Sequence, residues 1–288
     1  MTKPRIPIAR TVATLRRAVA RYRAAGETVA LVPTMGALHA GHLALVRRAQ
    51  KRCDRVVVSI FVNPAQFGPS EDFSTYPRTF DTDVRALADA QADLVWAPAS
   101  VTEMYPPGFA LQVVPAGPAV VGLEDRFRPH FFTGVATVVA KLLLQCLPDV
   151  ALFGEKDFQQ LRVVQRMAGD LDIPTTVVGV PTVRERDGLA LSSRNVYLSE
   201  AERAVAPEIH RALRDCTAGI ADGVAVAAAV AEGRERLARA GFAVDYFEAR
   251  HASTLEPIAA LTEGPVRLMV AARLGGTRLI DNLAVPAR

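Results

Sequence analysis

The chain has 288 residues, and 34 Lys and Arg against 30 Asp and Glu give it a formal net charge of +4. Half of the residues are apolar and 22% are charged, which is typical of a globular protein and excludes a disordered chain. This length suits one large domain or two moderate ones. No apolar run reaches the roughly 18 residues that a membrane-spanning helix needs.

Three cysteines, Cys53, Cys146 and Cys216, lie far apart in the sequence and form no CxxC pair. This spacing argues against a disulfide framework and a structural zinc site, and it favours the reducing cytoplasm. Nearly all basic residues are arginine, since only four are lysine. They are scattered among acidic residues, so we interpret them as a solvated surface rather than a nucleic-acid-binding stripe.

Helical patterns alternate with short apolar runs through the first two-thirds of the chain. The predicted helices cover 11–25, 41–53, 82–90, 134–146 and 157–171, and the predicted strands cover 28–32, 55–62, 93–96, 150–153 and 175–180. Pro33 is expected to end the first of these strands. Strands separated by helices of this length predict a parallel sheet with helices on both faces.

The pattern changes near residue 183. Helices are predicted over 200–218 and 224–240, followed by strands over 244–249, 266–272 and 278–280. Helices followed by strands indicate a small α+β domain. We therefore predict two domains, covering residues 1–182 and 183–288.

Two histidines follow the first predicted strand. The segment 33–42 reads PTMGALHAGH, with His39 and His42 three residues apart and glycines at 36 and 41. Ligands of open α/β sheets bind beyond the carboxyl ends of strands, and a helix N-terminus offers free N–H groups to phosphates. Two imidazoles there can donate hydrogen bonds to a reacting phosphate. The alternatives are two unrelated histidines or a metal-binding pair.

Amide side chains follow two of the predicted strands. Asn63 and Gln66 come after the strand at 55–62, and Gln160 lies just inside the helix that follows the strand at 150–153. Uncharged amides can orient the hydroxyl groups and the carboxylate of a small acid. The alternative for the first two is an ordinary Asn-Pro turn with an exposed glutamine.

Two further segments could bind phosphate. Lys156 comes after Gly154 at another strand-to-helix junction, and its compact ammonium suits a phosphate. Ser192, Ser193 and Arg194 form a loop whose hydroxyls and guanidinium can bind the β and γ phosphates of a nucleotide. The alternatives are a capped helix start with solvated charges and an ordinary loop.

In combination and order, these segments resemble the pantothenate synthetase family, the pantoate–β-alanine ligases. The matching motifs are PTMGALHAGH (33–42), SIFVNPAQFGPSEDFSTYPRT (59–79), GVATVVAKLL (134–143), PDVALFGEKDFQQL (148–161), VPTVRERDGLALSSRNVYL (180–198) and AARLGGTRLIDN (271–282). The resemblance implies a Rossmann-like ATP- and pantoate-binding domain of the HxGH nucleotidyltransferase superfamily and a smaller C-terminal lid domain. It also implies a cytoplasmic homodimer that makes pantothenate for coenzyme A synthesis.

The implied reaction has two steps. Pantoate attacks the α-phosphorus of ATP to give pantoyl adenylate and pyrophosphate, and β-alanine then displaces AMP. Positioning and electrostatics carry most of such a phosphate transfer. Mg²⁺ would shield the phosphates.

The resemblance also implies roles for individual residues. His42 is then the catalytic histidine, with His39 beside it and Lys156 on the phosphate. Gln66 and Gln160 bind pantoate, and Gln66 also contacts β-alanine. The residues implied for ATP are Met35, Gly36, Ala37, Leu38, His39, Ala40, Gly41, His42, Gly154, Glu155, Lys156, Asp157, Val183, Leu191, Ser192, Ser193 and Arg194. Further candidates for the site are Asn63, Glu124 and Arg128, and no residue is assigned to a metal ion.

The chain departs from the family in three places. Ala40 replaces the usual acidic residue of the HxGH loop, at a position expected to point outward. Leu191 replaces a common Met of similar size, so little is lost. Between residues 124 and 134, Asp125 stands where the family usually has Gly, and Phe131 where it has His. We expect this last change to affect flap or dimer contacts rather than the reaction.

Two other functions fit parts of the pattern. Another HxGH enzyme could transfer AMP or CMP to a phosphorylated alcohol, but the neutral Gln66 and Gln160 fit a hydroxy acid better than an acceptor phosphate. A nucleotide-sensing or RNA-binding module would use the basic charge. However, the sequence lacks aromatic stacking platforms beside basic stripes, and such a module would leave both histidines without a role.

Overall fold

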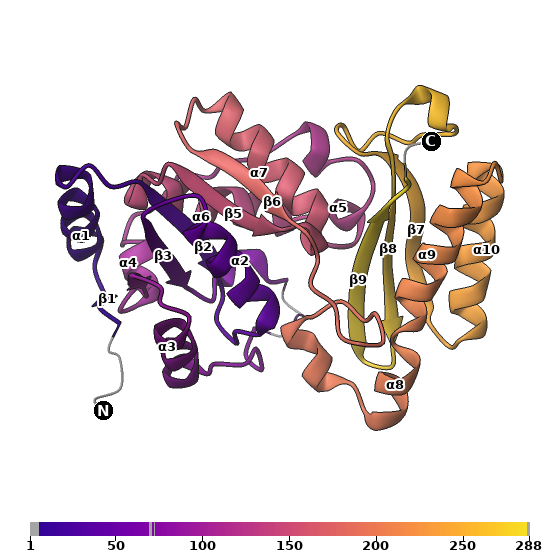
Figure 1. Cartoon of the computed structure of the whole chain (residues 1–288), viewed down its shortest axis with the longest axis horizontal. Helices are drawn as coiled ribbons and strands as arrows, with labels where there is room; N and C mark the ends of the chain where they lie inside the picture. The colour runs from indigo at the N-terminus through magenta and orange to yellow at the C-terminus, as the bar shows by residue number, and fades with distance from the viewer. Residues whose placement is uncertain (1–5, 69–70, 72, 287–288) are drawn as a thin grey trace.

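The computed structural model describes residues 6–68, 71 and 73–286, and a six-stranded sheet forms its larger part (Figure 1). The strands are β1 (Ile8–Ala9), β2 (Val29–Thr34), β3 (Arg55–Ile60), β4 (Leu94–Trp96), β5 (Val150–Gly154) and β6 (Thr176–Val180), in the spatial order β1-β4-β3-β2-β5-β6. Every pairing in this sheet is parallel, which confirms the predicted sheet type. Positions 69, 70 and 72 of the motif at 59–79 lie outside the described residues.

Helices cover both faces of this sheet. α1 (Val12–Ala24), α6 (Phe131–Cys146) and α7 (Phe158–Asp170) pack on one face, and α2 (Ala40–Gln50) and α3 (Phe80–Asp89) pack on the other. Along β2, Val29 and Leu31 join the core that contains α6, whereas Ala30 and Val32 join the core that contains α2. Because both faces of β2 are buried, its sequence is a continuous apolar run.

A smaller antiparallel sheet follows, built from β7 (Ala243–His251), β8 (Val266–Leu274) and β9 (Thr277–Ala284). On one face, Phe247 and Val270 pack in the core that contains α9 (Glu208–Ala221) and α10 (Val226–Arg239). On the other face, Tyr246 and Met269 belong to the core of the larger part. The small sheet therefore lies between its own helices and the six-stranded sheet, as Figure 1 shows.

Some predicted elements have different limits in the structure. The predicted helix at 200–218 is wrong as a single helix, because the chain forms α8 (Glu200–Val205) and then α9. Pro207 sits at the junction, and its ring and missing N–H disrupt a continuing helix. The first predicted strand continues through Pro33, which pairs in register only with Ser59 of β3. The short elements β1, α4 (Val101–Met104) and α5 (Glu124–Phe127) are additional to the prediction.

The strand order reverses between β2 and β5. From β2 the chain adds β3 and β4 on one side, and it then crosses over to add β5 and β6 on the other. The connections that leave β2 and β5 diverge, and open α/β sheets bind ligands in the crevice that results. The two predicted nucleotide-binding segments, 33–42 and 154–157, follow these two strands.

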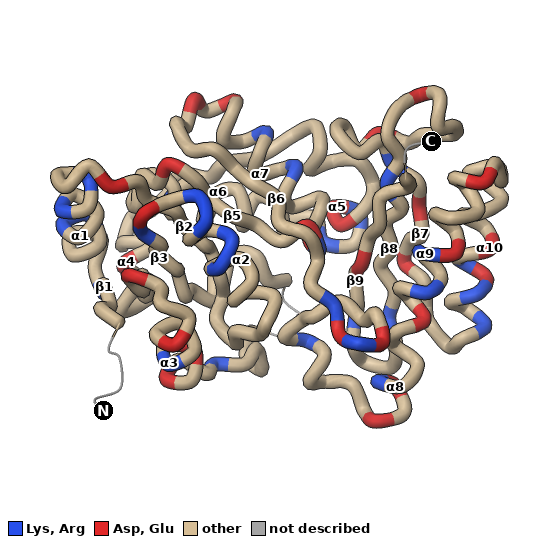
Figure 2. The backbone as a smooth tube through the Cα atoms, in the orientation of Figure 1, with Lys and Arg blue, Asp and Glu red and all other residues tan. Residues whose placement is uncertain are grey.

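Charged residues of both signs are mixed along the C-terminal helices (Figure 2). Arg236 pairs with Glu208 and Asp215, and Arg203 pairs with Glu185. Much of the positive charge there is thus balanced locally. Within the described ranges, no helix is both long and apolar enough to cross a membrane.

Candidate active site

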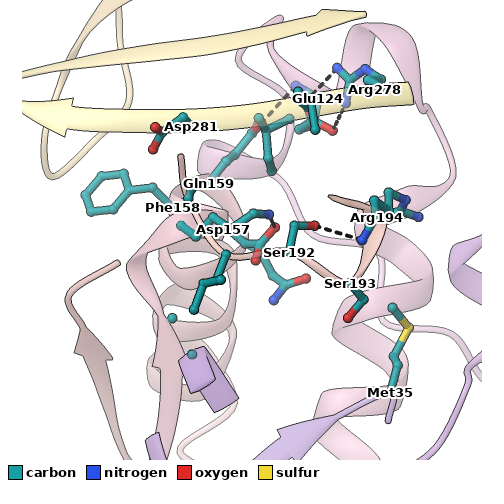
Figure 3. A pocket seen from close by; sticks show the side chains of 18 of the residues that line it. Met35, Glu124, Asp157, Phe158, Gln159, Ser192, Ser193, Arg194, Arg278 and Asp281 are labelled. Atoms are coloured by element: carbon teal, nitrogen blue, oxygen red, sulfur yellow. Dashed lines mark hydrogen bonds and ion pairs between the residues drawn. The ribbon is translucent and has the colours of Figure 1, made fainter. Parts of the chain in front are cut away.

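A cavity of about 670 Å³ lies at the crevice between β2 and β5 (Figure 3). Its walls include the ends of both strands, the first turns of α2 and α7, the loop around residues 181–195, and parts of β8 and β9. A space of this size holds a nucleotide-sized ligand. The small sheet therefore closes the site that the large sheet begins.

His39 and His42 stand at the N-terminal end of α2 and line the cavity, with ring centroids 4.1 Å apart. The Nδ1 atom of His39 accepts the Gly41 N–H at 3.1 Å, and the Nδ1 atom of His42 accepts the His39 N–H at 3.3 Å. A nitrogen that accepts a hydrogen bond carries no proton, so each neutral ring holds its proton on Nε2. Gly41 is required here because a Cβ at this position would lie 2.8 Å from Cε1 of His39.

Both histidines are held in the neutral form. Burial lowers the pKa of His39 to about 4, and the positive charge of Lys156 adds to this effect. Burial also lowers the pKa of His42 to about 3, with smaller contributions from His39 and Lys156. Near neutral pH the pair therefore presents two Nε2–H donors that carry no charge.

A buried carboxylate that the sequence analysis missed holds the loop before α2. Asp83 of α3 is 2% exposed, and it accepts the N–H groups of Ala37 at 3.0 Å and Leu38 at 2.9 Å. Gly36 and Ala37 have φ angles of +83° and +50°, a conformation that the loop does not favour by itself. The available signal was an aspartate four residues before Leu87, on the apolar face of the helix.

Lys156 lies in a one-turn 3-10 helix between β5 and α7 and lines the cavity. Its Nζ atom is 3.4 Å from Oδ1 of Asp157, a long ion pair and the single one that the ammonium makes among the described residues. Glu155 instead directs its carboxylate to Arg267 of β8, 2.9 Å away. This turn, Glu155–Asp157, is called the lysine turn below. It presents an ammonium to the cavity and a carboxylate to the small sheet.

Asn63 and Gln66 form an amide pair at the end of β3. Asn63 is 1% exposed; its Nδ2 donates to Oε1 of Gln66 at 3.1 Å, and its Oδ1 accepts the Tyr105 hydroxyl at 2.8 Å. Burial raises the pKa of Tyr105 to about 12, which keeps this donor protonated. The Nε2 atom of Gln66 donates to the sulfur of Met35, a weak acceptor that a ligand oxygen can replace.

Gln159 and Gln160 begin α7 but have different surroundings. Gln159 is 2% exposed, and its amide bonds the Glu124 N–H at 3.0 Å and the Asp125 carboxylate at 3.0 Å. Asp125 also accepts the Gly122 N–H, so this departure from the family closes a local turn. Gln160 lines the cavity and is less buried than its neighbour.

Glu124 joins the large sheet's wall to the small sheet. Both of its oxygens accept from Arg278 at 2.8 Å, and Tyr246 donates to it at 2.8 Å. Figure 3 shows Arg278 reaching across to Glu124 beside Gln159. Arg278 and Tyr246 line the cavity, and the sequence analysis assigned neither of them. The RLIDN motif at 278–282 contains Arg278, whereas no motif contains Tyr246.

Arg128 supports the part of the cavity wall that contains Gln66. It pairs with Glu71 through two contacts of 2.6 Å and donates to the Gln66 carbonyl at 3.2 Å. Its guanidinium lies 3.8 Å from the ring centroid of Phe131, a cation–π contact. The phenylalanine that departs from the family thus supports a cavity residue.

The loop at 191–194, which we call the serine loop, is hydrogen-bonded to the loop at 33–42, which we call the histidine loop. Ser193 donates to the Ala37 carbonyl at 3.1 Å, and the Leu191 N–H donates to the Val183 carbonyl at 3.0 Å. The cavity brings together the predicted residues Met35, His39, Gly41, His42, Gln66, Gly154, Lys156, Asp157, Gln160, Val183, Leu191, Ser192, Ser193 and Arg194. It does not bring in Gly36, Ala37, Leu38, Ala40 and Glu155. Ala40 is exposed, as expected.

The part of the chain that the structure describes contains no group of three His, Cys, Asp or Glu side chains that could hold a metal ion. A metal that enters this cavity with a nucleotide would thus rely mainly on the phosphates for its ligands. Asp157 lies in the same turn as Lys156, and its side chain is 45% exposed. An exposed carboxylate beside bound phosphates suits Mg²⁺, which keeps several water ligands.

Comparisons with known proteins agree over nearly the whole chain. The sequence model of the pantoate–β-alanine ligase family matches residues 7–284. A pantothenate synthetase of Nitrobacter hamburgensis is 61% identical over 283 residues, covering 98% of this chain and all of that protein. One of Rhodopseudomonas palustris is 60% identical over 285 residues, covering 99% of this chain and all of that protein.

Solved structures give the same result. The pantothenate synthetase of Thermus thermophilus superposes with a TM-score of 0.93 at 50% identity, over 98% of this chain and all of that one. The pantoate–β-alanine ligase of Francisella tularensis, complexed with β-γ ATP and β-alanine, superposes with a TM-score of 0.80 at 31% identity, over 97% of each chain.

Proposed function

The chain belongs to the pantoate–β-alanine ligase family and is a ligase of pantothenate biosynthesis, and we propose that it joins its substrates in two steps within the cavity described above. In the first step, a carboxylate oxygen of pantoate attacks the α-phosphorus of ATP and the bond to pyrophosphate breaks. In the second, the β-alanine amine attacks the pantoyl carbonyl carbon, AMP leaves, and the amine loses a proton. The adenylate is needed because a free carboxylate resists attack by an amine.

The observation that carries this proposal is the neutral histidine pair beside Lys156. Charge builds on the phosphate oxygens during adenylation, and preorganised donors stabilise such charge strongly in a site that excludes water. His42 and His39 offer Nε2–H groups, and Lys156 offers a positive charge whose ion pair with Asp157 is long, at 3.4 Å. The three groups surround the place where β2 and β5 diverge, and we assign them the catalytic roles.

ATP occupies the part of the cavity between the histidine loop and the serine loop. Met35, Gly41 and the histidines line one side, and Val183 with the segment 191–194 lines the other. Gly36, Ala37, Leu38 and Ala40 contribute by shaping the loop, and Gly154–Asp157 close the phosphate end. Bound together with the nucleotide, Mg²⁺ would neutralise phosphate charge. Asp157 is the residue that would hold it.

Pantoate occupies the neutral end of the cavity, between Gln66 and Gln160. Amides at these positions hydrogen-bond the hydroxyl groups and carboxylate of pantoate without adding a charge that would compete with the phosphates. We also assign β-alanine to Gln66, which lies in the 3-10 turn that follows β3 and lines the cavity. Asn63 fixes the orientation of Gln66 through the 3.1 Å bond between the two amides.

We also propose a cytoplasmic homodimer with residues 183–288 as a lid over the larger domain. Leu111 and Val114, in the extended segment before α5, are 67% and 74% exposed. That segment lies along α6, since the Val113 N–H donates to Thr137 at 3.0 Å. An apolar strip of this kind is suited to an interface between two copies. Light scattering should give twice the chain mass of 30.9 kDa.

The decisive experiment is pyrophosphate exchange. Labelled pyrophosphate should enter ATP when pantoate is present and β-alanine is absent, and AMP release should require both acids. If pyrophosphate exchange occurs only when β-alanine is present, the proposal that pantoyl adenylate is a stable intermediate is wrong. Exchange supported instead by a phosphorylated alcohol would favour the other HxGH chemistry.

A further inference from the structure

The side chain of Asn282 of β9 makes three hydrogen bonds at the wall of the cavity, and the residue is 2% exposed. Its Nδ2 atom donates to two consecutive carbonyls, that of Glu155 at 2.8 Å and that of Lys156 at 2.9 Å. Its Oδ1 atom accepts from Nε of Arg267 at 2.6 Å, and its own N–H donates to Asp281 at 2.7 Å. The side chain thus links the small sheet to the backbone of the lysine turn.

This arrangement requires an amide. The two carbonyls need a donor, and the guanidinium of Arg267 needs an acceptor, so only one orientation of the Asn282 side chain satisfies all three partners. Aspartate has the same shape and can still accept from Arg267, but it cannot donate to the carbonyls. An apolar residue would leave all three groups without their partner.

The turn that Asn282 holds has little support of its own. It is one turn of 3-10 helix, and its N-cap residue, Gly154, provides no side-chain capping bond. The small sheet supports it on both sides of Lys156. Arg267 pairs with Glu155 at 2.9 Å and lies 3.7 Å from the ring centroid of Phe158.

The backbone of Asn282 is held in place by its neighbour Asp281. Asp281 is 3% exposed, accepts the Asn282 N–H, and pairs with Arg184 through contacts of 2.6 and 2.9 Å. Arg184 lies in the chain that leads from β6 to the serine loop. The backbone of β9 at this point is therefore anchored to the segment that carries the other phosphate-binding residues.

From these contacts we propose that Asn282 is a positioning residue for adenylation, which sets the Lys156 backbone so that the ammonium meets the phosphates beside the histidine pair. The inference rests on the proposed function, in which Lys156 acts on the reacting phosphates. Asn282 acts through the turn and not on the substrate. It follows that the small sheet contributes to the first chemical step as well as closing the cavity.

The test is a double-mutant cycle on single-turnover formation of pantoyl adenylate, with Asn282→Asp, Asn282→Ala, Lys156→Ala and the two double variants. A displacement of about 1 Å in a catalytic group can cost about 100-fold in rate, and we expect a loss of that order in Asn282→Asp. In the Lys156→Ala background the same change should have almost no further effect, because the group it positions is gone.

The matched control is Asp245→Asn, which removes the negative charge from a different contact of the small sheet, the 2.7 Å pair between Asp245 and Arg278. It should leave the adenylation rate within about twofold of wild type, since it does not reach the lysine turn. The KM for β-alanine should not change in Asn282→Asp. Thermal unfolding of every variant separates loss of fold from loss of position.

Equal losses in the presence and absence of Lys156 would overturn the proposal, as would a wild-type rate in Asn282→Asp. Because the aspartate variant keeps the shape of the side chain, it remains informative if Asn282→Ala does not fold. If the wild-type protein makes no pantoyl adenylate at all, the proposed function fails. That result is read from the wild type before any variant is compared.

Discussion

Replacing Asp83 tests whether the conformation of the histidine loop depends on a residue outside the cavity. Asp83→Ala removes the acceptor for the Ala37 and Leu38 N–H groups. A buried donor left without a partner costs about 1–3 kcal/mol, so two cost about 2–6 kcal/mol. Water can enter the space that the carboxylate leaves, so we expect the lower end, about 2–3 kcal/mol of unfolding free energy.

The isosteric change Asp83→Asn should have a smaller effect. Ala37 donates to Oδ2 and Leu38 donates to Oδ1, so an asparagine keeps one acceptor and turns an NH₂ group toward the other donor. With Gly36 and Ala37 at positive φ, the loop then relaxes, and ATP binding should weaken in both variants. The losses of stability and of ATP affinity should both be greater in Asp83→Ala than in Asp83→Asn.

Urea unfolding gives the stability change, and titration calorimetry with ATP gives the binding change. The control is Asp81→Ala, because Asp81 is exposed and lies in the same first turn of α3. It therefore removes the same charge near the helix N-terminus without touching the loop. If Asp83→Ala and Asp81→Ala behave alike in both measurements, Asp83 does not hold the loop.

Three further outcomes are expected. Lys156→Arg should keep the fold but lose much of the adenylation rate, because a planar guanidinium cannot follow the phosphate as a compact ammonium does, whereas Lys51→Arg on the surface should match wild type in single-turnover assays. Gln66→Ala and Gln160→Ala should raise the KM for pantoate by an amount corresponding to about 1–3 kcal/mol, and an unchanged KM in both would remove them from the acid pocket. Because the folded state holds the pKa of His42 at about 3, against 6.5 ordinarily, only the unfolded state gains its proton as the pH falls from 6.5 toward 3. The unfolding free energy should therefore fall over that range, and less steeply in His42→Gln; equal slopes in denaturation curves would contradict this reasoning.

The sequence by itself determined the type and order of most secondary structure. The apolar run at 28–32 and the amphipathic helix after it follow from local rules, because a strand buried on both faces and a helix buried on one have distinct periodicities. The motifs at 33–42 and 154–157 could be placed at strand ends, and that placement alone puts them in one crevice of a parallel sheet. Resemblance then supplied the roles of single residues.

The tertiary structure alone decided which groups complete that crevice. Asp83 lies 45 positions from Leu38, Arg278 lies 154 from Glu124, and Asn282 lies 126 from Lys156. No periodicity relates the two ends of such a contact. The neutral state of His39 and His42 was equally out of reach, because it depends on burial and on the charge of Lys156 brought in by another strand. Burial and long-range contact are properties of the packed chain, and a local pattern records only which residues are available to make them.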